Sequence, residues 1–413
     1  MASTHSKLVA STPIIDGLMP AKVVTPADPQ ELASILARAA QEGQAVAPIG
    51  GGTSLALGNV PERLDLAVSL ANISGVISYE PTDLTLSVWA GSRFDEINKI
   101  LAENGQTLPI DVAFSDRATI GGRIATGIAG PRRSGSPTLR DLLIGVSAAH
   151  SSGTVTKAGG MVVKNVTGFD LMRVYLGSLG TLGVVLSANL KVLPVGRRDI
   201  TVSGTFSNLE KAIEVAGKIR ESRVRAVALE VFRSASDWSV AARIEGRETT
   251  VQLLADETAQ TLEGDVESFE GEASESWWNV FSEKEAPTTN GEDVVLRCST
   301  RPRCGHGLLK KLSIALEEFG GTVDHVSWAP VIGTTTLRCS FNDDENPRSK
   351  FLALRDGAMA AAENVTVLAA PPEWKAGMDI WGATPETIDV MRALKEQFDP
   401  ARILNPGRFV GGI

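Results

Sequence analysis

Three consecutive glycines, residues 50–52, constrain this chain more than any other feature. In the stretch VAPIGGGTSLALG they follow a short apolar run and precede Thr53 and Ser54. Without a Cβ, the backbone there can adopt positive φ and approach another group closely. Successive amide N–H groups in such a turn attract anions, and the two hydroxyls add donors. The stretch is therefore either a phosphate-binding loop or a tight turn between two strands.

Two common nucleotide-binding motifs do not fit this loop. A P-loop requires a Lys-Ser/Thr pair after its second glycine, and GGGTSLAL has none. A dinucleotide-binding fingerprint requires glycines that open a helix, whereas GNVPERLD leads from this loop into a strand. A phosphate-containing ligand would therefore have to be held by several separate loops.

Composition and charge exclude several classes of protein. The length of 413 residues suggests about two or three domains. The net charge is -9 and no basic run is interleaved with aromatics, which argues against a nucleic-acid groove. Cys298, Cys304 and Cys339 are widely spaced and the histidines form no H-x-H, so we expect no disulfide framework, iron–sulfur cluster or metal site.

The N-terminus, MASTHSKLVASTPIIDG, has no continuous apolar segment. No part of the chain approaches the ~18 consecutive apolar residues of a membrane span. We therefore expect a cytoplasmic protein, either soluble or held peripherally at the inner membrane through a complex.

Capping signals predict three helices, over residues 28–43, 92–105 and 207–222. Each begins with a residue that can cap a helix and carries an acidic residue three positions later, which is the pattern of a capping box. A last helix is expected over residues 384–399. The predicted cap and acid pairs are Asp28 with Glu31, Ser92 with Asp95, and Ser207 with Glu210.

The remaining pattern divides the chain in two. Residues 108–195 alternate short apolar segments with glycine-rich turns and close with a half-buried strand over residues 187–192. After residue 199, two rounds of β-α-β-β order predict a ferredoxin-like α+β domain, doubled or elaborated. Between these rounds, the acidic residues 255–293 are expected to be loop-rich, with a helix at their start.

Six motifs then occur in a characteristic order: PIGGGTS, ATIGGRIATG, LRDLLIG, GGMVVKNVTGFDL, GSLGTLGVV and FDPARILNPGRF. Together they resemble the vanillyl-alcohol-oxidase type, or PCMH-type, FAD flavoproteins, over roughly residues 20–195 and the C-terminal tail. Within that family the chain is most similar to the FAD-binding subunits of bacterial glycolate oxidases, the smaller of the two related flavin subunits. The short region after the flavin domain and the lack of the larger subunit's metal motif favour this assignment.

The resemblance implies an α+β fold in three parts. Residues 1–196 would form a two-subdomain PCMH-type FAD-binding domain. Residues 197–375 would form the ferredoxin-like α+β domain, acting as a cap, substrate or interface domain. Residues 376–413 would form a helix and a tail that pack back on the FAD domain.

The resemblance also implies which residues bind FAD. The glycine loop would cradle the pyrophosphate with its amide N–H groups, the residues near 183 would line the adenine end, and the C-terminal asparagine would return to the flavin region. Some family members attach flavin to a histidine after the three glycines, whereas Thr53 stands there in this chain, so FAD should be non-covalent. The predicted FAD-binding residues are Pro48, Gly50, Gly51, Gly52, Thr53, Ser54, Pro109, Ala118, Thr119, Gly121, Gly122, Ala125, Thr126, Gly183, Val184 and Asn405.

The catalytic residues are not identified by the sequence. Oxidation of a 2-hydroxy acid requires a cation for the carboxylate, a base or metal for the hydroxyl, and a hydride acceptor. Relatives that catalyse it usually carry a metal-binding H-x-H and an H-G-D-G-N-type motif, and this sequence has neither. His306 and His325 are interpreted as an ordinary helix-surface residue and an ordinary strand residue. Arg132, Arg133 and Arg140 could meet a carboxylate or form salt bridges.

Three tryptophans have two interpretations each. Trp277 and Trp278 lie in the acidic segment expected to be irregular, and Trp374 lies in APPEWKAG. Each could anchor a partner protein or pack inside the second domain.

Two functions of different classes follow. The first is an FAD-dependent oxidoreductase acting on CH–OH groups of 2-hydroxy acids: the flavin subunit of a glycolate oxidase or dehydrogenase complex. There it would pass electrons between a larger, substrate-oxidising flavin subunit and an iron–sulfur subunit as glycolate becomes glyoxylate. The second is a non-catalytic assembly subunit. A stand-alone FAD-dependent dehydrogenase of another 2-hydroxy acid or alcohol is the third possibility.

Overall fold

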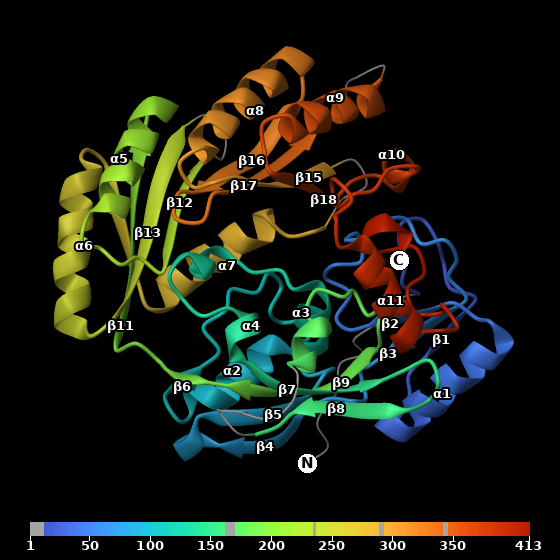
Figure 1. Cartoon of the computed structure of the whole chain (residues 1–413). Coiled ribbons are helices and arrows are strands. Elements are labelled where there is room, and N and C mark those ends of the chain that lie inside the picture. Colours follow the sequence, from blue (N-terminus) through green and yellow to red (C-terminus); the bar gives the residue numbers. More distant parts are fainter. Residues whose placement is uncertain (1–11, 162–169, 234–236, 289–292, 342–345) are drawn as a thin grey trace.

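The computed structural model describes residues 12–161, 170–233, 237–288, 293–341 and 346–413. Within these residues the strands form four sheets, of three, two, five and eight strands. Figure 1 shows the eight-stranded sheet, built from residues after 197, above the smaller sheets, which are built from residues before 195. Most of the motif GGMVVKNVTGFDL lies outside the described residues.

The three-stranded sheet leads the chain into the glycine loop. Its strands are parallel, in the order β1-β3-β2, and helix α1 crosses between β1 and β2. Asp28 caps α1 by accepting a 2.8 Å hydrogen bond from the Glu31 amide, and Gly43 ends it in the left-handed conformation, as predicted. These elements are β1 (Lys22–Val24), α1 (Pro29–Glu42), β2 (Val46–Ile49) and β3 (Leu66–Ser69).

The five-stranded sheet is antiparallel throughout, in the order β4-β5-β9-β7-β8. Strand β9 starts three residues before the predicted strand over residues 187–192 and ends one residue before its predicted end. Helix α3, which lies within the motif ATIGGRIATG, packs against β5 and β9. These elements and their neighbours are β4 (Val76–Glu80), β5 (Thr85–Trp89), α2 (Phe94–Ala102), β6 (Gln106–Thr107), α3 (Ile120–Thr126), α4 (Leu139–Leu142), β7 (Leu143–Ala149), β8 (Val155–Gly159), β9 (Val184–Lys191) and β10 (Leu193–Pro194), with β6 and β10 forming the two-stranded sheet.

The eight-stranded sheet contains two consecutive β-α-β-β-α-β rounds, which confirms the doubled ferredoxin-like prediction. Its order is β14-β11-β13-β12-β16-β17-β15-β18, and the rounds meet where β12 pairs with β16. Helices α5, α6, α8 and α9 cover one face, while α7 lies on the face toward the smaller sheets (Figure 1). The elements are β11 (Arg198–Phe206), α5 (Leu209–Glu221), β12 (Ala228–Arg233), β13 (Trp238–Gly246), α6 (Glu248–Leu262), β14 (Val266–Glu270), α7 (Glu272–Lys284), β15 (Asp293–Ser299), α8 (Gly305–Phe319), β16 (Thr322–Ala329), β17 (Thr334–Ser340), α9 (Pro347–Met359) and β18 (Asn364–Ala369).

Two of the predicted capping boxes are wrong. Helix α2 begins after Arg93 and has no side-chain cap, because the Ser92 hydroxyl instead accepts a 2.9 Å hydrogen bond from the Gly75 amide. Helix α5 is capped by Asn208, one residue after the predicted serine, which accepts from the Lys211 amide. At α2 a tertiary hydrogen bond takes the serine hydroxyl away from the helix, and at α5 the neighbouring asparagine is the cap instead.

The acidic segment over residues 255–293 starts with the end of helix α6, as predicted, but its remainder forms strand β14 and helix α7 where loops were expected. Trp278 and Phe281 lie one turn apart on this helix and are buried against the inner face of the sheet. The Trp278 indole donates a 2.7 Å hydrogen bond to the Thr201 hydroxyl. Trp374 is also buried and stacks on Phe351. Packing, and not partner anchoring, therefore accounts for Trp278 and Trp374.

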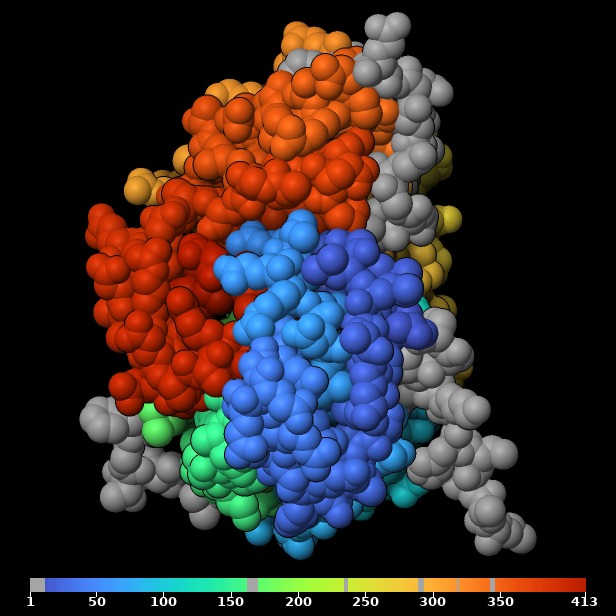
Figure 2. All heavy atoms as spheres, turned by 90° about the vertical axis from the view of Figure 1, so that its right-hand side faces the viewer, coloured from blue at the N-terminus to red at the C-terminus, as the bar shows by residue number. Residues whose placement is uncertain are grey.

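The C-terminal segment returns to the smaller sheets, as the fold prediction requires. Helix α10 (Pro372–Lys375) and helix α11 (Ile388–Phe398) lead into a tail that runs beside β2. Val46 donates to the Ile403 carbonyl (2.7 Å) and accepts from the Asn405 amide (2.9 Å). Figure 2 shows the C-terminal atoms packed against the N-terminal region, below the helices of the eight-stranded sheet. The domain boundaries themselves stay a prediction.

A buried lysine fastens this tail. The Lys395 ammonium is 2.8 Å from Asp399 Oδ2 and donates to the Thr181 (2.8 Å) and Leu404 (2.9 Å) carbonyls. Only 2 % of the Lys395 side chain and 0 % of the Asp399 side chain are exposed. Burial lowers the pKa of Lys395, while the Asp399 charge acts to raise it.

Among the described helices, none is long and apolar enough to cross a membrane.

Replacing Lys395 tests how much the tail depends on this pair. Lys395→Met leaves Asp399 buried without its cation, so we expect the free energy of unfolding to fall by about 3 kcal/mol. The matched control is Lys99→Met, which removes an exposed ion pair to Asp95 and should cost less than about 1 kcal/mol. Urea denaturation of both variants measures the difference, and equal losses would contradict the role given to Lys395.

Candidate functional site

The predicted FAD-binding residues come together around two adjoining cavities. Pro48, Gly50, Thr119, Gly122 and Ala125 line both of them. The first cavity adds the rest of the glycine loop and the tail, and the second adds the residues near 183. The predicted residues that line only the first are Gly51, Gly52, Thr53, Ser54, Ala118, Thr126 and Asn405, and those that line only the second are Gly121, Gly183 and Val184.

The glycine loop lies directly against the start of helix α3. A Cβ on Gly51 would lie 1.7 Å from the Arg117 carbonyl oxygen, and one on Gly50 would lie 2.2 Å from Thr119 Oγ1. Gly52 has a φ of 72°, which a glycine adopts without strain. The loop therefore needs glycine at these positions to bring its backbone to the cavity, which is the arrangement an anionic diphosphate requires.

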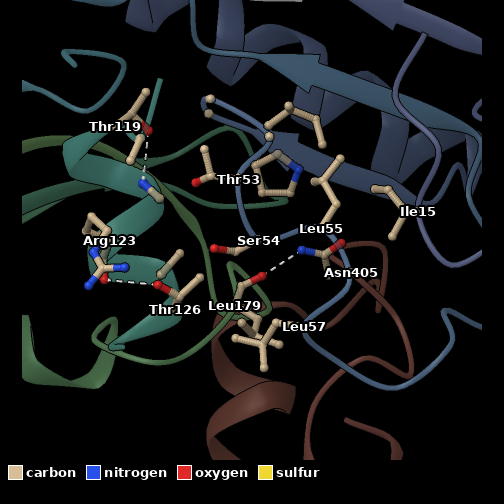
Figure 3. A pocket seen from close by; sticks show the side chains of 18 of the residues that line it. Ile15, Thr53, Ser54, Leu55, Leu57, Thr119, Arg123, Thr126, Leu179 and Asn405 are labelled. Atoms are coloured by element: carbon tan, nitrogen blue, oxygen red, sulfur yellow. Dashed lines mark hydrogen bonds between the residues drawn. The ribbon is translucent and has the colours of Figure 1, made fainter. Parts of the chain in front are cut away.

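Helix α3 forms one wall. Thr119 caps it by accepting a 3.2 Å hydrogen bond from the Gly122 amide. A Cβ on Gly121 would lie 2.7 Å from the Ala90 Cβ, so glycine lets the helix sit close to the end of β5. Figure 3 shows Thr53 and Ser54 between this helix and the wall opposite.

The opposite wall is fixed by the C-terminal tail. Asn405 has a φ of 43°, and its side-chain amide donates a 2.6 Å hydrogen bond to the Leu179 carbonyl. Asparagine tolerates this left-handed conformation better than most residues. Figure 3 shows this bond beside Ser54. One residue along, Gly180 is packed against Pro48, where a Cβ would lie 2.8 Å from the proline Cγ.

One predicted residue lies elsewhere, and several lining residues were not predicted. Pro109 lines a separate groove between the smaller sheets and the eight-stranded sheet, with Arg132 and Arg243. Arg123 and Arg408 line the first cavity, and each stands inside a motif already recognised, GGRIATG and NPGRF. Leu179 likewise stands inside the motif GSLGTLGVV, whereas Ile15 had no distinguishing signal in the sequence.

A third, smaller cavity continues from the first toward the eight-stranded sheet. Thr53, Ser54 and Arg123 line both cavities, and Arg297 of β15 and Ser282 of α7 join them from the other side. Among the described residues, the Nε atoms of both arginines and the Ser282 hydroxyl are buried without a hydrogen-bond partner. Buried donors without partners are costly unless a ligand satisfies them.

Both signs of charge occur around this third cavity. Arg123 is 7 % exposed and donates to the Asp111 (3.4 Å) and Ile128 carbonyls. Burial, with the nearby charge of Arg297, lowers the pKa of Arg123 to about 10, so this guanidinium remains charged at neutral pH. Two carboxylates also line the cavity: Asp111, which pairs with Arg132 at 3.2 Å, and Glu285, which is 4.0 Å from Arg297. The unpartnered Nε atoms of the two arginines therefore offer hydrogen-bond donors to an anion.

The other residues proposed for catalysis are placed differently. Arg132 pairs with Asp111 at 3.2 Å and with Glu245 at 2.6 Å, and so acts as a salt bridge. Arg133 and Arg140 are exposed. His306 is exposed on α8 and His325 is buried on β16, as interpreted from the sequence. No group of described side chains could hold a metal ion.

Comparisons with known proteins agree with this geometry. A family model described as "FAD binding domain" matches residues 20–159, and a model described as "FAD linked oxidases, C-terminal domain" matches residues 381–409. The chain belongs to the PCMH-type FAD-linked oxidases. It is an FAD-linked oxidoreductase, and FAD is its cofactor.

Two curated relatives match most of the chain, and a third matches about a third of it. The glycolate oxidase subunit GlcD of Bacillus subtilis is 25% identical over 422 residues, covering 94% of this chain and 89% of that protein. The D-2-hydroxyglutarate dehydrogenase of Xanthomonas citri is 24% identical, with the same coverage. The glycolate oxidase subunit GlcE of Escherichia coli is 37% identical over 143 residues, covering 34% of this chain and 41% of that protein.

The fold is also that of a solved structure. A structure of alkyldihydroxyacetonephosphate synthase superposes with a TM-score of 0.68 at 16% identity, covering 94% of this chain and 76% of that one. At this identity the likeness concerns the fold. The residues present fit FAD, because the loop that the glycines bring to the cavity offers amide and hydroxyl donors with no lysine needed.

A single methyl group in the glycine loop tests the site. Gly51→Ala forces a Cβ into the Arg117 carbonyl, so we expect the purified protein to lose most of its flavin, measured as the ratio of absorbance at 450 nm to protein. The matched control is Gly217→Ala on α5, where a Cβ meets nothing within 4 Å. That change should keep the flavin and raise helix stability by about 1 kcal/mol. Full flavin content in Gly51→Ala would contradict the assignment.

Proposed function

We propose that this chain is the FAD-binding subunit of an enzyme that oxidises glycolate to glyoxylate and passes the electrons to an iron–sulfur partner. The similarity to GlcD over most of both chains and the local similarity to GlcE support a glycolate oxidase complex. The dehydrogenases of D-2-hydroxyglutarate and D-lactate among its relatives support the wider class, FAD-dependent oxidation of a 2-hydroxy acid.

The observation that carries this proposal is the third cavity. A 2-hydroxy acid always presents a carboxylate, and Arg123 and Arg297 place two charged guanidinium groups with free Nε–H donors at the end of the FAD cavity. Charge-assisted hydrogen bonds of this kind are stronger than neutral ones, and the planar guanidinium matches a carboxylate. Thr53 and Ser54 line both cavities and would lie between the cofactor and this anion.

Oxidation removes a hydride from the carbinol carbon and a proton from its hydroxyl. When bound, FAD supplies the hydride acceptor. We assign Arg123 and Arg297 to hold and orient the carboxylate of the substrate. Because Thr53 stands where some family members have the histidine that attaches flavin, we expect the cofactor to be bound non-covalently. None of the described residues lining the three cavities is a histidine, and their carboxylates, Asp111 and Glu285, already accept hydrogen bonds from Arg132 and Ser327. The proton acceptor is therefore unassigned, which favours a contribution from a partner.

This missing base also supports the second candidate, a subunit that binds FAD for electron transfer or assembly while a larger flavin subunit oxidises the substrate. The third candidate is a stand-alone dehydrogenase of another 2-hydroxy acid or alcohol. A cytoplasmic location, with peripheral attachment to the inner membrane through the complex, belongs to the same proposal.

An anaerobic absorption spectrum separates these candidates. Flavin that bleaches with glycolate in the isolated chain means a complete active site. Bleaching only in the presence of the GlcD-like and iron–sulfur partners supports the electron-transfer subunit, and no bleaching in either case excludes glycolate.

The carboxylate assignment has its own test. Oxalate carries the carboxylate but has no C–H bond to lose, so its binding can be followed as a perturbation of the flavin spectrum without turnover. We expect Arg297→Met to weaken oxalate binding about tenfold or more, because it removes a charge-assisted contact. Arg301→Met removes the same charge from an exposed position of the same domain and should leave the dissociation constant unchanged. Equal affinities in the two variants would remove Arg297 from the site.

A further inference from the structure

A buried lysine outside the cavities holds the loop that forms them. The Lys375 ammonium donates to the Ala56 carbonyl at 2.9 Å and to the Gly58 carbonyl at 3.1 Å, and it forms an ion pair with Asp16. An ammonium has three N–H donors, and each has an acceptor here. Lys375 is 1 % exposed and does not line the FAD cavity.

A second buried cation holds the alternate carbonyls of the same segment. Arg408 donates to the Leu55 carbonyl at 2.7 Å and to the Leu57 carbonyl. It is 5 % exposed and lies 3.9 Å from Asp16 Oδ2. Four consecutive carbonyls, directly after Thr53 and Ser54, are therefore fixed by two side chains from the last forty residues of the sequence.

The charges of this cluster do not cancel. Two cations, Lys375 and Arg408, face one carboxylate, that of Asp16, whose side chain is 2 % exposed. Burial lowers the pKa of Lys375 and raises that of Asp16, and the ion pair opposes both shifts. The excess positive charge lies beside the glycine loop, where it favours an anionic diphosphate.

Lys375 also belongs to the segment that leaves the eight-stranded sheet. It ends helix α10, which follows the last strand, β18. Leu57 belongs to the same buried apolar cluster as Trp374 and Ile380. Ile380 also donates its amide to Asn59 Oδ1 at 2.9 Å. The loop after the three glycines is thus docked, by charge and by packing, on residues 372–381.

We propose that Lys375 is a positioning residue for FAD: it fixes residues 55–58, and through them Thr53 and Ser54, and so couples the cofactor site to the segment leaving the eight-stranded sheet. Any such coupling is reciprocal. If the docking of residues 372–381 strengthens the binding of FAD, then bound FAD must stabilise that docking by the same free energy. FAD should therefore stabilise residues 372–381 although they lie outside its cavity.

The first test is the affinity for FAD of the full-length chain stripped of flavin, measured by quenching of flavin fluorescence. We expect Lys375→Met to raise the dissociation constant at least tenfold. Trp278→Phe removes a buried hydrogen bond on α7 from a side chain that lines none of the three cavities, and serves as the control for a general loss of stability, with an unchanged dissociation constant. An unchanged dissociation constant in Lys375→Met overturns the proposal.

The second test uses the unmodified protein and so does not depend on whether a variant folds. Hydrogen–deuterium exchange is compared with and without FAD. We expect FAD to slow amide exchange in residues 50–58 and also in residues 372–381. Slowing in the glycine loop alone overturns the proposal. The inference rests on the cofactor only, and neither test uses a hydroxy acid, so it stands or fails separately from the proposed substrate.

Discussion

The docking of the C-terminal tail on strand β2 is the interaction on which the rest of the site depends. Two backbone hydrogen bonds join Val46 to the tail, and the Asn405 side chain reaches across to the Leu179 carbonyl. These contacts join three segments that are far apart in sequence, at the point where the glycine loop begins. Without the tail, one wall of the first cavity would be missing. The two family matches at opposite ends of the chain therefore describe one site, since the residues of both meet here.

The eight-stranded sheet adds the chemistry that the smaller sheets lack. Its inner face presents Arg297 to the cavity edge, where Arg123 of α3 arrives from the opposite side. A second contact, in which Arg132 of a 3₁₀ helix (Pro131–Ser134) meets Glu245 of β13, holds the two parts together beside this cavity. Because this ion pair is partly buried, solvent screens it less than a surface pair. The relative placement of the two guanidinium groups is thus maintained by neighbouring charges of the same interface.

Most of the fold and most of the residues that line the two candidate cavities could be predicted from the sequence, because both depend on local patterns. The glycine motifs occur where another part of the chain comes so close to the backbone that a Cβ would clash with it. The repeated β-α-β-β order follows from the periodicity of apolar residues. The errors have tertiary causes. Ser92 looked like a cap but accepts a hydrogen bond from Gly75, and the acidic segment became helix α7 because Trp278 and Phe281 share a buried face. The third cavity could not be foreseen, since no local pattern links Arg123 to Arg297.

The absence of an evident base around the described cavities follows from the same electrostatics. Two guanidinium groups would stabilise a bound carboxylate and also the alkoxide that forms as its hydroxyl loses a proton. They cannot accept that proton themselves. Burial and the charge of Glu285 raise the pKa of Glu230 well above its ordinary range, and Glu230 lines none of the three cavities. The lack of a free proton acceptor among the described lining residues is thus the feature on which the proposed partner contribution rests.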